Sequence, residues 1–220
     1  GPPAPPAAET GRALANLAGE DAAKREAAVT VLGRTGDPKW LAFLGALREG
    51  SVYARVRGGT TELVVGVRRS TRGDQDVIEI QSAYERAPLG TTPVAELREV
   101  GADRALRLVI KPFLDAGETR AQLADPDPAV RRGAAVKLGH QAAAGAEAVV
   151  AAALGKETDR WARHALAEAL ALIRLAHAPP AARAAAAAAL GDLHSSNGLP
   201  ALQRLAADAA ASPAERDAAA

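Results

Sequence analysis

The stretch DPDPAVRRGAAVKLGH, residues 125–140, carries a pattern that this chain uses more than once. Residues 21–33 read DAAKREAAVTVLG and residues 179–191 read PPAARAAAAAALG, so an arginine, small residues and a closing Leu-Gly recur. Aspartate and proline suit the first turn of a helix, and a glycine after leucine suits its end. The pattern therefore predicts a helix that is repeated along the chain.

A second helix is predicted after two of these copies, because leucines recur there at three-residue steps. The leucines are Leu41, Leu44, Leu47, Leu199, Leu202 and Leu205. Each unit would be a helix–turn–helix of roughly 30–40 residues, and neighbouring units must stack to bury a core. Arg163 and Arg183 stand too close for a full pair, which favours one long helix near residues 160–176 with an apolar stripe from Trp161 to Leu175.

The composition supports closely packed helices. Hydrophobic residues make up 48% of the chain and aromatic residues 3%, with alanine, the best helix former, dominating. The formal net charge of +1 provides no global field for nucleic acid or a membrane surface. No stretch approaches the ~20 apolar residues of a membrane span. The absence of cysteine excludes disulfides and thiolate sites.

We find no sequence motif for catalysis or metal binding. The four histidines, at 140, 164, 177 and 194, are spaced without a metal-binding motif, and no nucleotide-binding or nucleophile motif is present. No pair of carboxylates stands out as a general acid and base. We therefore expect no catalytic residue, no metal and no cofactor.

Residues 51–104 interrupt the helical pattern. SVYARVR and TTELVVGVR alternate in the manner of strands and flank Gly58-Gly59, a hairpin turn signal. VIEIQ adds a third strand through Ile78 and Ile80. RRSTRGDQD and APLGTTP are expected to be loops, and we expect the helix that follows to end or kink at Pro112. The segment predicts a small β-hairpin or three-stranded sheet that leans on a helix.

The strands of this interruption are basic, since residues 51–72 hold five arginines and a single glutamate, Glu62. The simplest interpretation is a solvated strand face. The alternative is a docking surface for an acidic partner, anchored by Tyr53. Nucleic acid is disfavoured because only one aromatic residue interleaves with the basic ones. The candidate partner-binding residues are Tyr53, Arg55, Arg57, Arg68 and Arg69.

The repeated R-x-x-A-A-x-x-L-G pattern, followed by G-D-P and a leucine-rich second helix, resembles the HEAT-repeat family. The resemblance implies an all-α, right-handed α-solenoid of helix–turn–helix repeats, here with a small inserted β element. It also implies that the repeated arginine bridges neighbouring repeats through a carboxylate or backbone carbonyls. That structural role is expected for Arg25, Arg131, Arg163 and Arg183.

The order of motifs resembles the N-terminal domain of the permease B subunit of bacterial urea ABC transporters. The residues that carry this likeness are Gly36-Asp37-Pro38, Tyr53 with Arg55, Val64-Val65, Pro88-Leu89-Gly90, Asp127-Pro128 with Arg131, and Lys156-Glu157-Thr158-Asp159. The resemblance implies a soluble, non-catalytic domain in the periplasm or extracytoplasmic space, as part of an inner-membrane protein. It implies a protein partner near the pore, either the solute-binding protein or a second copy, and no nucleic acid.

These observations predict one domain in four stretches. Residues 1–10 are a linker or processed terminus, residues 11–50 the first HEAT-like helices, residues 51–104 the inserted β element, and residues 105–220 further repeats. The final SPAERDAAA begins another copy of the pattern, so we expect a truncated C-terminus. A free-standing HEAT-repeat adaptor is the main alternative, and membrane spans downstream would exclude it. A bilin-lyase-like enzyme is disfavoured by the scarcity of aromatic residues.

Overall fold

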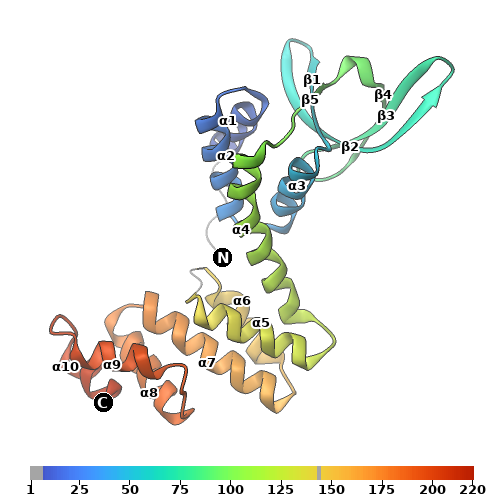
Figure 1. Cartoon of the computed structure of the whole chain (residues 1–220). Helices are drawn as coiled ribbons and strands as arrows, with labels where there is room; N and C mark the ends of the chain where they lie inside the picture. The colour runs from blue at the N-terminus through green and yellow to red at the C-terminus, as the bar shows by residue number, and fades with distance from the viewer. Residues whose placement is uncertain (1–6, 143–144) are drawn as a thin grey trace. The chain divides into compact units, whose positions relative to one another are not determined.

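The computed structural model describes residues 7–142 and 145–220, and the chain divides into two compact units between Gly117 and Glu118 (Figure 1). We call them the sheet unit, up to Gly117, and the helical unit, from Glu118 onward. Of the expected linker, residues 1–6 lie outside the described residues, and the remainder belongs to the first helix.

Four helices belong to the sheet unit: α1 (Ala7–Ala18), α2 (Ala22–Arg34), α3 (Pro38–Glu49) and α4 (Arg104–Ala121), the last of which crosses the unit boundary. Asp21 and Asp37 cap α2 and α3 by accepting hydrogen bonds from the backbone N–H groups of Lys24 and Lys39. The helices bury large apolar side chains against one another, namely Leu17, Leu32, Phe43, Leu44, Leu47 and Ile110. Pro112 lies inside α4 and does not end it.

A five-stranded antiparallel sheet forms the rest of this unit. Its strands are β1 (Val52–Arg57), β2 (Thr60–Arg72), β3 (Gln75–Ser82), β4 (Pro88–Pro93) and β5 (Arg98–Glu99), in the order β4-β3-β2-β1-β5. β4 and β5 are the two edge strands, so the segment that connects them crosses from one edge of the sheet to the other. This segment contains the 3-10 turn η1 (Val94–Glu96), and we call it the crossing segment. The predicted turn between β1 and β2 is confirmed, since Gly58 and Gly59 both have positive φ, as a tight hairpin requires.

The predicted all-α solenoid with a small inserted β element is wrong, because the chain is a mixed α/β protein with a five-stranded sheet. Two polar segments that are expected to be loops are mostly strand: in RRSTRGDQD only Gly73-Asp74 forms a turn, between β2 and β3. The outer half of β2 lacks alternation because it forms an exposed ribbon with β3, so neither of its faces has to be apolar. PLGTTP forms β4, where its prolines lie on an edge strand that tolerates a missing N–H donor.

Both faces of the sheet are covered by apolar residues. Val52, Ala54 and Val65 pack with the helices. On the other side of the same strands, a separate cluster joins Tyr53, Val64, Ile78 and Ile80 to Val94 and Leu97 of the crossing segment. The crossing segment therefore covers a second face that the sequence pattern suggested was open to solvent.

The helical unit contains η2 (Gln122–Ala124), α5 (Pro128–His140), α6 (Glu147–Lys156), α7 (Arg160–His177), α8 (Pro180–Asp192), α9 (Leu199–Ala207) and α10 (Pro213–Ala219). The predicted single long helix is confirmed as α7, against which α5, α6 and α8 pack. Its expected stripe is wrong at Trp161, which lies in the first turn and is 57% exposed, with the Arg160 guanidinium 4.5 Å from its ring centre.

Candidate functional site

Tyr53, the expected surface anchor, is buried, with 5% of the residue exposed. Its ring belongs to the apolar cluster under the crossing segment, and its hydroxyl oxygen accepts a hydrogen bond of 2.8 Å from Arg69 Nη2. This bond raises the pKa of Arg69 above its ordinary value, so the guanidinium stays charged. Tyr53 and Arg69 therefore stabilise the packing of the sheet, and the Tyr53 ring is not exposed as an anchor for a partner.

The remaining arginines of the expected surface do not form one patch. Antiparallel pairing places Arg55 opposite Glu62 and Arg68 opposite Glu79, with N–O distances of 2.9 and 2.6 Å. Of the arginines at 55, 57, 68 and 69, Arg57 alone is exposed and has no side-chain partner among the described residues. Counting charges within residues 51–72 did not reveal that Arg68 is neutralised, because its partner Glu79 lies on the next strand, β3.

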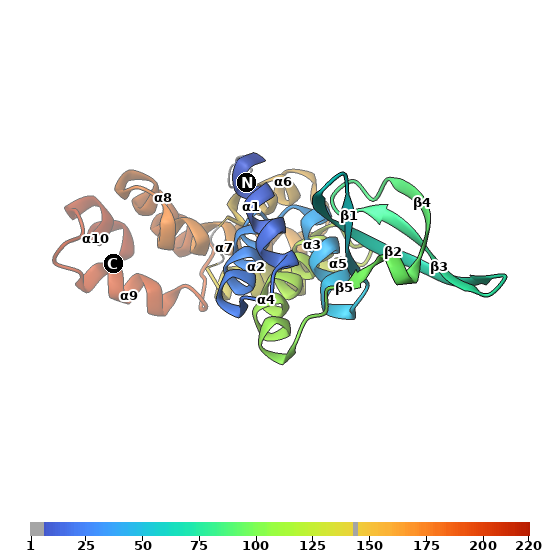
Figure 2. The ribbon, with the colours of Figure 1, turned by 90° about the horizontal axis from the view of Figure 1, so that it is seen from above.

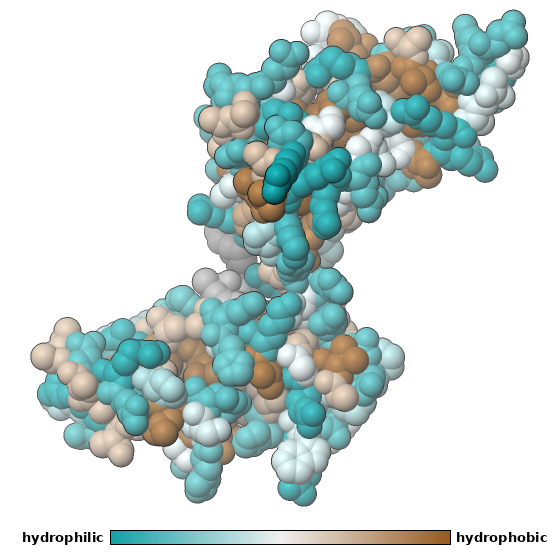
Figure 3. Space-filling model, in the orientation of Figure 1, coloured by the Kyte–Doolittle hydropathy of each residue, from teal (hydrophilic) through white to brown (hydrophobic). Residues whose placement is uncertain are grey.

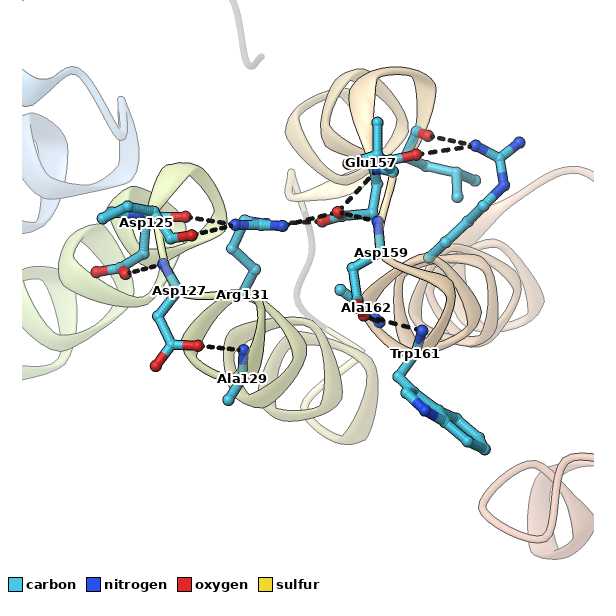
Figure 4. A network of polar contacts seen from close by, with 12 residues as sticks. Asp125, Asp127, Ala129, Arg131, Glu157, Asp159, Trp161 and Ala162 are labelled. Carbon is cyan, nitrogen blue, oxygen red and sulfur yellow. Dashed lines mark hydrogen bonds and ion pairs between the residues drawn. The ribbon is translucent and has the colours of Figure 1, made fainter.

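The repeated arginines lie at joints between helices. Arg131 of α5 donates to both carboxylate oxygens of Glu157, at 2.7 and 2.8 Å, and also to the carbonyls of Asp125 and Pro126 (Figure 4). Arg163 of α7 donates to the carbonyl of the same Glu157. One buried carboxylate thus joins the start of α5 to the turn before α7.

The environment of Glu157 stabilises its charged form. Its side chain is 3% exposed, and the backbone N–H groups of Thr158 and Asp159 donate to it at 2.9 Å. The hydrogen bond from Arg131 lowers the pKa of Glu157 to about 2, assisted by those N–H groups and opposed by burial. Glu157 is therefore a carboxylate at every physiological pH.

A similar joint links α8 to α10. Arg183 Nε donates to Glu215 at 2.6 Å, and Glu215 is 1% exposed. Hydrogen bonds from the side chain and backbone of Ser212, followed by the contact with Arg183, lower the pKa of Glu215. In the sheet unit, Arg25 donates to the backbone carbonyl of Gly101. All four repeated arginines therefore contact the kinds of acceptor that a structural role requires.

A third buried carboxylate, Glu168 of α7, was missed by the sequence analysis. It accepts hydrogen bonds from Ser195 Oγ at 2.5 Å and Asn197 Nδ2 at 3.0 Å, which tie the turn before α9 to α7. No local pattern in the sequence links Ser195 or Asn197 to this distant acceptor. Within residues 7–142 and 145–220, no group of three or more His, Cys, Asp or Glu side chains is placed to hold a metal ion.

The helical unit also contains an apolar groove of about 670 Å³ between α6 and α8. Both views show α7 between these two helices, and α7 forms the floor of the groove (Figure 1 and Figure 2). Alanines line it at helical spacing: Ala167 and Ala171 from α7, and Ala182, Ala185, Ala186 and Ala189 from α8. Leu154 of α6 and Leu170 of α7 complete the apolar surface.

The charged groups of the groove lie near its ends. Arg174 and Glu147 form an ion pair of 2.8 Å where α7 ends and α6 begins, close to His177. Asp192 lies at the end of α8, towards the other end of the groove. Small side chains along the walls allow a backbone to approach closely, and charges at the ends set direction. These features suit the binding of a helix.

Comparison with protein-family models and with curated proteins finds no match to this chain. None of the helices in the described part of the chain is long and apolar enough to cross a membrane.

Proposed function

We propose that this chain is a non-catalytic protein-binding module whose helical unit holds an α-helix of a partner in the groove between α6 and α8. The observation that carries the proposal is the lining of that groove, in which alanines at i, i+3, i+4 and i+7 of α8 face the floor formed by α7. A helix laid into a hydrophobic groove is a recurring mode of peptide recognition.

The buried joints support this function because they hold the groove's walls in place. Glu157 fixes the turn between α6 and α7, and Glu168 ties the turn after α8 to α7. A groove that is formed before the partner arrives avoids the free-energy cost of ordering it during association. The same helices therefore supply a rigid receptor.

The charges at the groove's ends favour one orientation of the bound helix. Asp192 lies towards the end of the groove away from His177, where it would attract the positive N-terminus of a helix. At the other end, His177 and Arg174, whose charge is shared with Glu147, would face the negative C-terminus. A partner helix parallel to α7 satisfies both ends.

The likeness of the sequence to the urea-transporter permease domain supports an extracytoplasmic setting beside a transport pore. In that setting the solute-binding protein of the same transporter is the partner that we propose, and the module presents a fixed surface to it. A second copy of the chain is the competing occupant, and the experiment separates the two.

The test compares two single substitutions on α8, Ala185→Trp and Ala188→Trp. Ala185 lines the groove, whereas Ala188 is exposed on the same helix outside it. We expect Ala185→Trp to weaken binding of the purified solute-binding protein about tenfold or more, measured by biolayer interferometry, because the indole fills the groove. Ala188→Trp should leave binding unchanged.

Equal binding by both variants would exclude the groove as the contact. Sedimentation equilibrium of the chain alone provides the second arm. A dimer that Ala185→Trp dissociates and Ala188→Trp does not would replace the solute-binding protein with a second copy as the occupant. Circular dichroism spectra of the two variants check that α8 remains helical.

A further inference from the structure

The sheet unit carries a second candidate binding surface, which is basic and whose charges are not needed for the packing of the fold. It is a hollow of about 520 Å³ where the end of α3 meets the beginning of α4. Its lining includes Arg48, Arg104, Arg107, Leu108 and Lys111. We call these five residues the α4 patch. Figure 3 shows a small hydrophobic area over the upper part of α4, bordered by strongly hydrophilic side chains.

Most of the positive charge in the α4 patch is unpaired. Within the described part of the chain, the side chains of Arg48, Arg104 and Arg107 have no hydrogen-bond or ion-pair partner. Asp103 lies beside them, but its carboxylate caps α4 by accepting from the N–H of Leu106 at 2.8 Å. This contrasts with the sheet, where Arg55 and Arg68 each have a glutamate directly across the strand pair.

The arrangement works against the stability of the isolated helix. Arg104 and Arg107 are an i,i+3 pair of like charges, and Arg107 and Lys111 an i,i+4 pair, which repel on a helix surface. Lys111 pairs with Asp115 on its far side, and the N-cap Asp103 is the one carboxylate among the described residues that line the hollow, since the first turn of α4 itself has no acidic residue. Leu108, between these cations, is 63% exposed. A local cost of this kind is expected where a surface serves binding.

We infer that the α4 patch docks an acidic segment of a partner protein that carries one apolar side chain over Leu108. Carboxylates would neutralise the free arginines, and the hollow would receive the apolar residue. This surface is independent of the proposed groove, since it lies in the other unit and recognises charge. It stands even if the groove binds nothing.

The shape and composition of the α4 patch favour a protein over a membrane or a nucleic acid. A concave lining receives a side chain, whereas a flat lipid surface needs a projecting one. No aromatic residue lines the hollow to stack on a base. An acidic peptide with a central leucine matches both the charge and the exposed Leu108.

The experiment uses the whole chain and a synthetic helical peptide with glutamate at i, i+3 and i+7 and leucine at i+4, the charge inverse of the α4 patch. Fluorescence anisotropy measures its affinity for wild type and for two double variants. Arg104→Glu with Arg107→Glu reverses the patch. Arg57→Glu with Arg72→Glu makes the same charge change on exposed arginines of the sheet.

We expect the patch variant to bind the peptide at least about tenfold more weakly than wild type, and the sheet variant to bind it as wild type does. Leu108→Ala should weaken binding severalfold without changing its salt dependence. Equal loss in both double variants would overturn the inference, because it would show a response to net charge alone. Stronger retention on phosphatidylserine vesicles than on the peptide would overturn it in favour of a membrane surface.

Discussion

Two arginine–glutamate ion pairs in this molecule have nearly equal N–O distances but differ widely in solvent exposure. In the helical unit, Arg131 and Glu157 are 2.7 Å apart, with side chains 17% and 3% exposed. In the sheet unit, Arg68 and Glu79 are 2.6 Å apart, with side chains 73% and 45% exposed. Distance alone does not separate them. The number of hydrogen bonds does, because Glu157 also accepts two backbone N–H groups and Arg131 also donates to two carbonyls.

The difference shows what an ion pair needs in order to hold a fold together. A buried carboxylate is costly to remove from water, so its partners must satisfy all of its lone pairs, and losing one partner leaves an uncompensated charge. An exposed pair exchanges its partner for water at little cost. Arg131 is therefore structural because its acceptors are buried, whereas the exposed strand arginine Arg68 is not.

The largest expected effect comes from Glu157→Gln. The neutral amide keeps the shape of the side chain but leaves Arg131 without its counter-charge in a buried site. We expect a loss of about 3 to 5 kcal/mol in the free energy of unfolding of the helical unit, measured by urea denaturation with far-UV circular dichroism. A loss no greater than that of an exposed glutamate would show that the joint does not stabilise the unit.

Acid should remove the same contribution from the wild-type protein. The pKa of Glu157 is about 2 in the folded protein and lies below its ordinary value of 4.5, so its contribution is complete above pH 4.5 and declines as the pH falls towards 2. The amide that Glu157→Gln introduces does not titrate. The difference in unfolding free energy between wild type and Glu157→Gln should therefore shrink between pH 4.5 and pH 2.

Other carboxylates, including Glu215, titrate in both proteins and cancel in this difference. The measurement is the urea midpoint of the two proteins at a series of pH values. A difference that stays constant down to about pH 2 would contradict the assignment of the low pKa to Glu157.

The repeated helices were predictable from sequence because their signals are local, whereas their contacts were not. Pro128, Arg131 and the small residues of α5 correctly predict one helix, but the acceptor Glu157 is far along the chain. The Leu-Gly endings predict helix C-termini, yet Gly139 lies inside α5, where an added Cβ would stand 2.9 Å from the Cα of Ala169. The glycine permits close packing against α7.

The extent of the sheet and both candidate surfaces depended on tertiary structure. The outer half of β2 has no apolar alternation, and Tyr53 is buried only because the segment around Val94 crosses over it. The groove exists because α6 and α8 stand apart on α7, which no local pattern encodes. The α4 patch, in contrast, could have been predicted from the sequence, since the spacing of Arg104, Arg107 and Lys111 places them on one helical face.

The smallest expected effect on stability comes from Glu79→Gln, which removes the exposed ion pair of the comparison. Glu79→Gln removes the counter-charge of Arg68 on the exposed ribbon of β2 and β3, where water replaces it at once. We expect the urea midpoint of the sheet unit to stay within experimental error of the wild type at about 0.15 M salt. Any small difference seen at about 0.01 M salt should vanish as salt is raised, because exposed charges are screened. A salt-independent loss would mean that the ribbon, like the helical joint, relies on a desolvated charge, and the distinction between the two pairs would fail.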